Sequence, residues 1–296
     1  MCIISIKGSF GTILTLYMNE VDAHLNKEYF FISCFKSNKI GDDAAVIGEW
    51  IVSKDAFFEN VHFKREWLDL EDISYKSMII NISDSIAMNA DPKYALLAVA
   101  IPSNLSTDDI RRLHSGFDKA AKEFGIEIIG GDTISNVKID ITVTILAKSN
   151  RVLRRTGLKP GDFLAHTGSL GSSKKGLTSL LRYNTAQKSS RFFKPELRQS
   201  FVKRAAASLC CGMDISDGLF ADLGKLSKAN KLGFSFERTI PKRVACSGEE
   251  YEMLIGFSPR QRKKMIRLAK AERCELTLFA RARRKHYKSL CKANHF

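Results

Sequence analysis

Short acidic residues recur in this sequence at glycine turns, at the ends of apolar runs and inside one apolar stretch. Five such places stand out in the 296-residue chain: Gly41-Asp42-Asp43-Ala44, Ser53-Lys54-Asp55, Asn81-Ile82-Ser83-Asp84, Gly130-Gly131-Asp132-Thr133 and Met213-Asp214-Ile215-Ser216-Asp217-Gly218. Aspartate and glycine make ordinary turns, and that explanation is favoured for any one of the five. It explains Asp84 poorly, because a lone charge inside an apolar helix is costly to bury.

If these acids converge, cations must balance them, because two unit charges 4 Å apart repel by about 4 kcal/mol at an effective dielectric near 20. Oxygen ligands without a His/Cys cluster favour Mg²⁺ over zinc. Because Mg²⁺ is usually shared between carboxylates and substrate phosphates, the pattern indicates nucleotide chemistry with several Mg²⁺ ions. The sequence has neither a Walker phosphate loop nor a G-x-G-x-x-G after a strand, and its six histidines form no Ser/His/Asp pattern.

Alternating strands and helices are expected to position these acids in the first half of the chain. Hydrophobic periodicity predicts strands at 50–53, 94–101, 126–129 and 139–147, and helices at 72–88 and 108–124. The strand at 94–101 is nearly all apolar, which is typical of a strand buried on both faces. Ser106 or Thr107 caps the second helix and Gly125 ends it. The residues Gly130-Gly131-Asp132-Thr133 predict a turn.

The second half begins near residue 148, where the chain becomes rich in turns. We expect a strand at 163–167 and helices at 175–182, 195–207, 219–229 and 260–275, with no helix between Pro241 and Ser247. These patterns predict two domains, 1–148 and 149–296, of the α/β (α+β) class.

The composition is that of a soluble globular protein, with 44% hydrophobic and 27% charged residues. No apolar run approaches the roughly 20 residues that span a bilayer, so no membrane partner is expected. The net charge of +15 is the sum of −6 in residues 1–148 and +21 in residues 149–296, and the tail Arg260–Lys292 alone carries +11. Charge blocks are usually solvated helix faces and this tail has few aromatic residues, so nucleic-acid binding is a minority interpretation.

Seven scattered cysteines without a C-x-x-C pair are typical of a reducing compartment, and we interpret them as core residues of a cytoplasmic protein. The apolar segment 1–17 carries a single charge, Lys7. Two explanations stay open for it: a true N-terminal extension or a mis-assigned start codon.

Eight motifs occur in an order that resembles a known family. They are Gly41-Asp42-Asp43-Ala44, Ser53-Lys54-Asp55, Val61-His62-Phe63, Asn81-Ile82-Ser83-Asp84, Gly130-Gly131-Asp132-Thr133, Arg155-Thr156-Gly157-Leu158-Lys159-Pro160-Gly161-Asp162, Asp214-Ile215-Ser216-Asp217-Gly218 and Ser247-Gly248-Glu249-Glu250. Over residues 28–256 the chain resembles the thiamine-monophosphate kinases of the PurM-like, AIR synthase-related ATP-binding superfamily.

The resemblance implies a two-domain PurM-like fold, with an N-terminal mixed sheet and helices and a C-terminal α/β domain. It also implies a homodimer formed through the N-terminal sheets. The implied reaction transfers the γ-phosphoryl group of ATP directly to thiamine monophosphate, giving thiamine diphosphate, without a protein nucleophile. The implied Mg²⁺ ligands are Asp43, Ser53, Asp55, Asp84, Asp132, Asp214 and Asp217. The implied ATP contacts are Gly131, Asp132, Arg155 and Ser216, and His62 and Glu249 contact thiamine phosphate.

Two departures from the family pattern affect these expectations. Lys54 stands where the family usually has threonine, and it can point outward, replace one ion or weaken the site. Gly248-Glu249-Glu250 stands where the family usually has two glycines and Glu-Asp, which makes thiamine recognition less certain than ATP binding. Two other functions remain open: an ATP-dependent enzyme similar to aminoimidazole ribonucleotide synthetase, and a basic nucleic-acid-binding protein.

Overall fold

The computed structural model describes residues 27–291, which belong to two compact units. Residues 27–38 belong to one unit, whose described part contains helix α2 (Lys27–Ser33). The other unit, Lys39–Lys292, contains both β-sheets and all the candidate site residues. The two explanations for segment 1–17 concern residues outside the described part of the chain.

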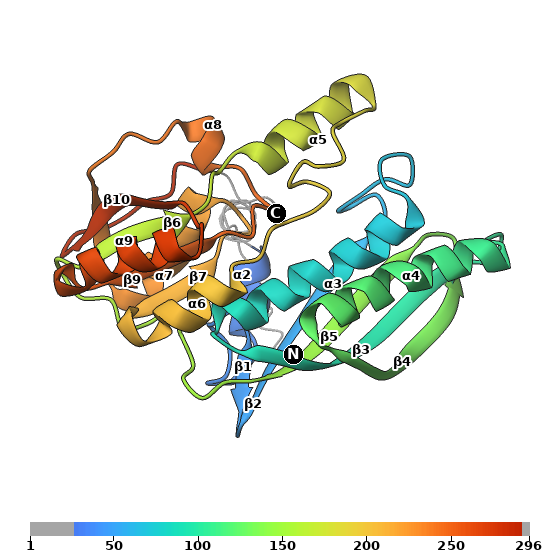
Figure 1. Ribbon diagram of the computed structural model, residues 1–296, viewed down its shortest axis with the longest axis horizontal. Helices are drawn as coiled ribbons and strands as arrows, with labels where there is room; N and C mark the ends of the chain where they lie inside the picture. Colours follow the sequence, from blue (N-terminus) through green and yellow to red (C-terminus); the bar gives the residue numbers. More distant parts are fainter. Residues whose placement is uncertain (1–26, 292–296) are drawn as a thin grey trace, which may run out of the picture. The chain divides into compact units, whose positions relative to one another are not determined.

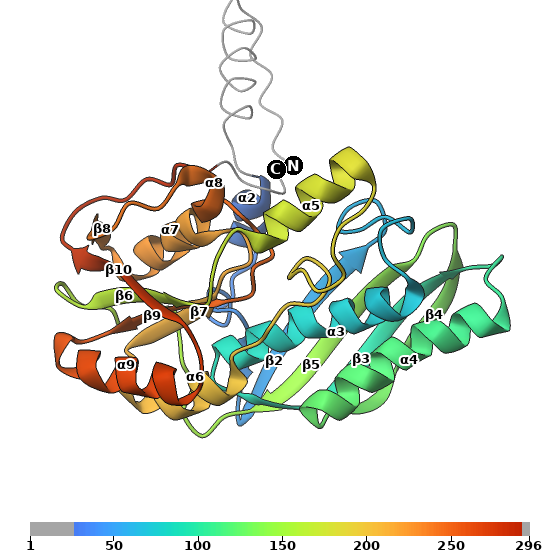
Figure 2. The ribbon, with the colours of Figure 1, turned by 45° about the horizontal axis from the view of Figure 1, so that its top comes forward.

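The first sheet is mixed, and two long helices cover one of its faces (Figures 1 and 2). Its strands follow the order β1-β2-β5-β3-β4 and comprise β1 (Ala45–Ile47), β2 (Trp50–Phe58), β3 (Asp91–Pro102), β4 (Glu127–Asn136) and β5 (Asp140–Lys148). Helix α3 (Leu70–Ala87) packs on the sheet beside helix α4 (Thr107–Phe124). Ser106 and Asp109 form a capping box at the start of α4, and Gly125 ends it in the left-handed conformation, as expected.

Three predictions for this half were wrong. Strand β2 does not end at Ser53 but continues to Phe58, paired with β5 along its whole length. Strand β4 runs straight through Gly130–Thr133 instead of turning there, because β3 supplies hydrogen-bonding partners for that segment. Strand β3 is buried on one face only: Leu96 is 38% exposed, since helices cover just one side of the sheet.

The second sheet lies between helices on both of its faces (Figure 2). Its order is β7-β9-β6-β10-β8, with β6 (Phe163–Thr167), β7 (Cys211–Asp214), β8 (Gly233–Phe236), β9 (Met253–Phe257) and β10 (Leu276–Arg283). Helices α6 (Gln199–Ala205) and α9 (Arg262–Ala271) pack on one face and α7 (Leu219–Asn230) on the other. Helix α5 (Ser172–Tyr183) and the one-turn helix α8 (Lys242–Ala245) complete this half, together with 3₁₀ turns at Ala206–Ser208 and Pro259–Gln261.

Two helix predictions needed correction here. Helix α6 is shorter than the predicted 195–207, because it begins only at Gln199 and ends in a 3₁₀ turn. Helix α8 occupies the segment between Pro241 and Ser247, where no helix was expected.

One hydrophobic core runs from the first sheet to the α6 and α9 face of the second, and a separate cluster lies under α7. The α/β (α+β) class is confirmed by this mixture of elements, and the domain boundary near residue 148 stays a prediction. Cys211 and Cys274 are core residues as expected. Cys246 and Cys291 instead form a disulfide, which corrects the expectation for these two cysteines. Within residues 27–291, none of the helices has the length and apolar character that crossing a membrane requires.

Candidate active site

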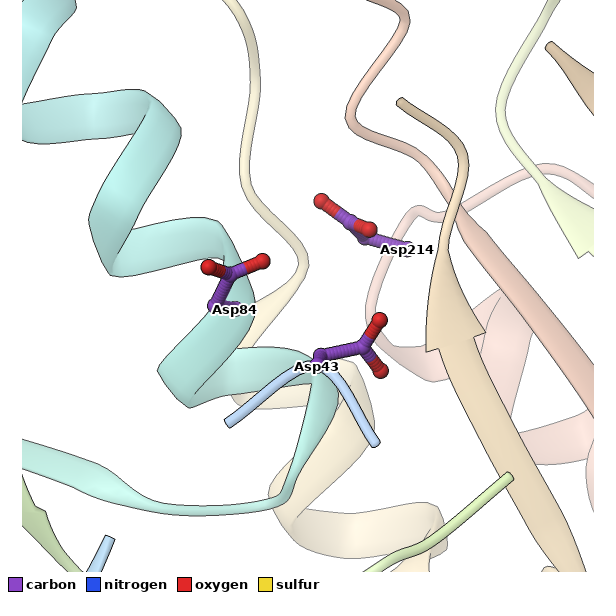
Figure 3. A group of neighbouring side chains, drawn as sticks. All are labelled: Asp43, Asp84 and Asp214. Carbon is purple, nitrogen blue, oxygen red and sulfur yellow. The ribbon is translucent and has the colours of Figure 1, made fainter. Parts of the chain in front are cut away.

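Three aspartates from distant parts of the sequence meet between the two sheets. Asp43 lies in the turn before β1, Asp84 on α3 and Asp214 at the end of β7, and their carboxyl groups face a common space (Figure 3). One carboxylate oxygen from each lies within 4.8 Å of the others. The sequence predicted all three as metal ligands, and the fold brings them together.

Arg155 is a cation in direct contact with this trio. Arg155 donates from Nη2 to Asp43 Oδ1 at 2.6 Å, and its backbone N–H donates to Asp42 at 2.9 Å. Arg154 forms an ion pair with the other oxygen of Asp42 at 2.7 Å. The turn at 41–43 is therefore anchored to the segment that begins the second half, and this contact places Arg155 at the aspartates.

Burial and mutual repulsion make the trio hard to ionise. Burial raises the pKa of Asp214 to about 8, with the charge of Asp43 adding to the effect. Burial also raises the pKa of Asp84 well above its usual range, and the charges of Asp55, Asp214 and Asp43 raise it further. Burial raises the pKa of Asp43 too, although Arg155 opposes this rise. A cation bound among the three would remove this penalty.

Asp55 and Ser53 point toward the helix-covered face of the first sheet, because alternate residues of a strand share a face. Burial and then the charge of Asp43 raise the pKa of Asp55 to about 6, so Asp55 belongs electrostatically to the cluster. The Ser53 hydroxyl donates to the Asn81 side chain at 2.5 Å, which ties β2 to α3. Two residues further along α3, Ser83 donates to Asp214 at 2.7 Å and joins α3 to β7.

The donor set fits Mg²⁺. All three members of the trio offer carboxylate oxygens, the ligands that this hard cation prefers. Asp43 Oδ2 is buried and has no hydrogen-bond partner, although a carboxylate oxygen in that position normally has one. A cation among the three carboxylates would satisfy this oxygen.

Two expected ligands of the nucleotide lie elsewhere. Gly131 and Asp132 are exposed on β4, the edge strand at the far side of the sheet from β2. Asp132 pairs with Ala98, which in turn pairs with Thr142 on β5. Asp132 therefore points to the open face, opposite to the side chain of Asp55. Their assignment to ATP and Mg²⁺ stays a prediction that the geometry of one chain does not favour.

Lys54 also points to the open face of the sheet, away from the aspartates. Its ammonium group donates to Thr142 Oγ1 at 3.1 Å on the neighbouring strand. Of the three roles considered for this lysine, the outward orientation is the one found.

A second group of polar residues lies around Phe57 and joins the two expected thiamine-phosphate contacts. The His62 ring stacks near Phe57, with centroids 5.7 Å apart, and His62 Nδ1 accepts from the Phe58 N–H. Lys76 Nζ lies 5.5 Å from the centre of the Phe57 ring and 4.2 Å from that of the Phe192 ring. Its ammonium group donates to Glu249 at 2.7 Å, although Lys76 is completely buried. His62 and Glu249 thus belong to one neighbourhood.

Glu249 is presented by a constrained loop. Both Glu249 and Tyr251 have positive φ, 55° and 51°, a conformation that costs non-glycine residues of order 1–3 kcal/mol each. The loop is held against the residues after β7: Glu249 N–H donates to Ser216 and Tyr251 N–H to Ile215. Burial, and then the charges of Glu249, Asp55, Asp214 and Asp84, raise the pKa of Tyr251.

Asp217 and Ser216 follow Asp214 at the start of α7. The carbonyl oxygen of Ser216 accepts a hydrogen bond from the Glu249 N–H, and this contact brings the loop of Glu249 next to the aspartate cluster. Asp217 forms an ion pair with Lys225 at 2.6 Å.

Three residues of this site were missed by reasoning from the sequence: Lys76, Lys225 and Asp222. The signal for Lys76 was present, because it is a charge inside the same apolar helix that made Asp84 conspicuous. Asp222 and Lys225 gave no such signal, because acidic and basic residues three apart on a helix are ordinary.

The comparisons with known proteins agree with this geometry. The family model described as AIR synthase related protein, N-terminal domain, matches residues 41–148. The thiamine-monophosphate kinase of Bacillus subtilis (strain 168) is 36% identical over 213 residues, which are 64% of each chain. That of Buchnera aphidicola subsp. Schizaphis graminum is 30% identical over 258 residues, 76% of this chain and 78% of the relative. The match thus spans just under two thirds of the Bacillus protein and more than three quarters of the Buchnera one.

A solved structure confirms the expected fold. The crystal structure of thiamine-monophosphate kinase from Stenotrophomonas maltophilia K279a superposes with a TM-score of 0.74 at 25% identity, over 88% of this chain and 93% of that one. Motifs, fold and sequence similarity therefore agree, and this chain belongs to the thiamine-monophosphate kinase family.

Proposed function

We propose that this protein is an ATP-dependent kinase that converts thiamine monophosphate to thiamine diphosphate. The observation that carries the proposal is the convergence of Asp43, Asp84 and Asp214, with Arg155 at their side. This arrangement of buried carboxylates and one guanidinium suits a nucleotide triphosphate bound with Mg²⁺. The names of the relatives supply the acceptor.

The donor side of the proposed site is built from the aspartate cluster. Asp43, Asp84 and Asp214 would hold Mg²⁺, with Asp55 close enough to share its charge. When bound, Mg²⁺ supplies neutralising charge for the phosphate oxygens. Arg155 is held in place by Asp43 and Asp42, so its guanidinium is pre-oriented for a phosphate group.

The acceptor side is the neighbourhood of Phe57. We assign His62 and Glu249 to thiamine monophosphate, as the family resemblance implies. Lys76 holds the Glu249 carboxylate through its 2.7 Å hydrogen bond, and it is itself held between the rings of Phe57 and Phe192. A buried cation next to an acid of the substrate site fixes the position of that acid before the substrate arrives.

The proposed transfer needs no covalent intermediate on the protein. An oxygen of the acceptor phosphate attacks the γ-phosphorus of ATP, the bond from that phosphorus to the bridging oxygen breaks, and ADP leaves with the electron pair. Two phosphates must approach each other, so the main task of the chain is to position them and to stabilise negative charge.

Four further statements are part of the proposal. Gly131, Asp132 and Ser216 contact ATP, and Ser53 completes the metal-binding set. The chain comprises domains 1–148 and 149–296. It works in the cytoplasm, where ATP is available. It forms a homodimer through the open face of the first sheet, where Leu96 and Ile134 are 38% and 58% exposed.

A direct assay tests this function: purified protein, ATP, Mg²⁺ and thiamine monophosphate, with thiamine diphosphate measured by chromatography. Asp84→Asn should reduce the rate about 100-fold or more, because it removes a carboxylate that would hold the Mg²⁺ needed to neutralise the phosphates. The matched control Asp118→Asn changes an exposed aspartate on the neighbouring helix α4 and should retain the rate. Mg²⁺-dependent ATP binding without product would favour a sister enzyme similar to aminoimidazole ribonucleotide synthetase. Absence of ATP binding would refute the proposal.

A further inference from the structure

Lys225 is placed between two carboxylates at the margin of the aspartate cluster. It lies on α7, and its Nζ is 2.6 Å from an oxygen of Asp217 and 2.8 Å from an oxygen of Asp222. The Asp222 side chain is completely buried, and the Lys225 side chain is only 20% exposed. An ammonium group therefore occupies the position between the two carboxylates that a shared metal ion would take.

A backbone hydrogen bond also joins Asp217 to Asp222 directly. The N–H group of Asp217 donates to the second oxygen of Asp222 at 3.1 Å. Asp217 and Asp222 are thus joined to each other as well as to the lysine. Asp222 Oδ1 is buried without a hydrogen bond, as is Asp43 Oδ2, but the Lys225 ammonium 2.8 Å away is its ion-pair partner.

The charge of Lys225 also reaches the aspartate trio. It lowers the pKa of Asp43 and of Asp214, partly opposing the effect of burial on each. Lys225 Nζ also forms ion pairs with Asp217 and Asp222, so it carries its positive charge between two carboxylates. A divalent ion placed at Asp217 would therefore be repelled by it.

We propose that the Lys225 ammonium takes the place of the Mg²⁺ ion that Asp217 was expected to bind, so that this chain loads one ion fewer together with its nucleotide. The inference rests on the proposed function in one respect, namely that the trio binds Mg²⁺ with ATP. It adds that Asp217 is not a metal ligand in this protein. Lys225 is a positioning residue that supplies a built-in charge.

Counting bound ions tests the inference without measuring activity. Mn²⁺ replaces Mg²⁺, a non-hydrolysable ATP analogue is present at saturation, and the free Mn²⁺ signal in electron paramagnetic resonance gives the number bound. Asp217→Asn should leave the count of the wild-type protein unchanged. Lys225→Met should raise it by an additional ion, and the double variant should return to the wild-type count. Lys228→Met, a change of the same type on an exposed part of α7, is the matched control.

The possible outcomes separate the inference from the proposed function. A lower count in Asp217→Asn, or an unchanged count in a folded Lys225→Met, would overturn the inference. Asp217→Asn alone decides the question if Lys225→Met does not fold, because Asp217 is partly exposed and the substitution keeps its shape. A wild-type protein that binds no Mn²⁺ with the nucleotide would overturn the proposed function and the inference together.

Discussion

The aspartates of the site store unfavourable electrostatic energy in the metal-free chain. Asp214, with its pKa raised to about 8, and Asp55, with its pKa raised to about 6, keep protons in the folded state at pH values where the unfolded chain has released them. The folded state therefore binds more protons than the unfolded state between about pH 4 and 8. In that window the stability of the metal-free protein must decrease as the pH rises.

Thermal unfolding in a chelator should show this decrease. We expect the Tm to fall by about 5 °C between pH 6 and 8.5, and we expect the stabilisation by Mg²⁺ to grow over the same interval, because the ion competes with protons. Asp214→Asn should flatten both dependences, since its amide does not titrate. A Tm in chelator that rises with pH would contradict the arrangement of charges described above.

Lys76 is the second residue whose effect can be separated from the fold. Lys76→Met keeps most of the apolar stem between Phe57 and Phe192 but removes the hydrogen bond to Glu249. A charge-assisted hydrogen bond contributes roughly 1.5–3 kcal/mol, so we expect the KM for thiamine monophosphate to rise about 10- to 100-fold. The KM for ATP should change little, because the affected group faces the acceptor side.

Steady-state kinetics with each substrate varied in turn measure this difference. Lys119→Met is the matched control, since the exposed Lys119 on α4 makes an ion pair of similar length with Glu71 on α3. Equal increases of KM for ATP and for thiamine monophosphate would show that Lys76 supports the site as a whole and does not position Glu249 alone.

At the scale of elements, the β3–β4 pair shows how close packing depends on a glycine. Gly131 has a φ of 149°, and a Cβ atom on it would lie 1.6 Å from the carbonyl oxygen of Leu97. Gly131→Ala must therefore displace β4, and we expect it to lower the free energy of unfolding by about 1–3 kcal/mol. Gly224→Ala, in the interior of α7, should raise it by up to about 1 kcal/mol, because a Cβ atom there would meet no other atom within 4 Å.

Urea unfolding of the two variants measures the contrast. Gly131→Ala should shift the midpoint downward and Gly224→Ala upward, with unchanged slopes if the unfolded states are alike. Equal stability of Gly131→Ala and the wild-type protein would mean that β4 can move at no cost.

Asp84 on α3 and Asp132 on β4 show which parts of the site can be predicted from the sequence and which cannot. Asp84 could be recognised because a charge in an apolar helix requires a partner, and α3 indeed carries it into the cluster. The face of Asp132 could not be recognised. A bulge between Ala95 and Leu96 shifts the register of β4 by one residue, and this shift turns Asp132 to the open face of the sheet. Local sequence carries no trace of such a pairing between distant strands.

At the scale of the whole molecule, the open face of the first sheet exposes apolar side chains to solvent. It carries Leu96 and Ile134 exposed, together with Lys54 and Asp132 near opposite edges. A two-fold interface brings each part of a surface against the same surface of the partner, so a face with apolar residues between opposite charges can be self-complementary. This is the physical reason for expecting a homodimer here.

Sedimentation velocity tests the assembly. The wild-type protein should sediment as a dimer, and the double variant Leu96→Glu/Ile134→Glu should be a monomer with unchanged secondary structure, because two buried charges per subunit oppose closure of the interface. Val137→Glu is the control: Val137 is 86% exposed in the turn between β4 and β5, where a charge meets only water. A dimer that survives the double variant would place the interface elsewhere and leave the exposed leucine and isoleucine without a structural reason. A wild-type monomer would mean that the open face is tolerated in water, and that Asp132 has no partner chain to contact.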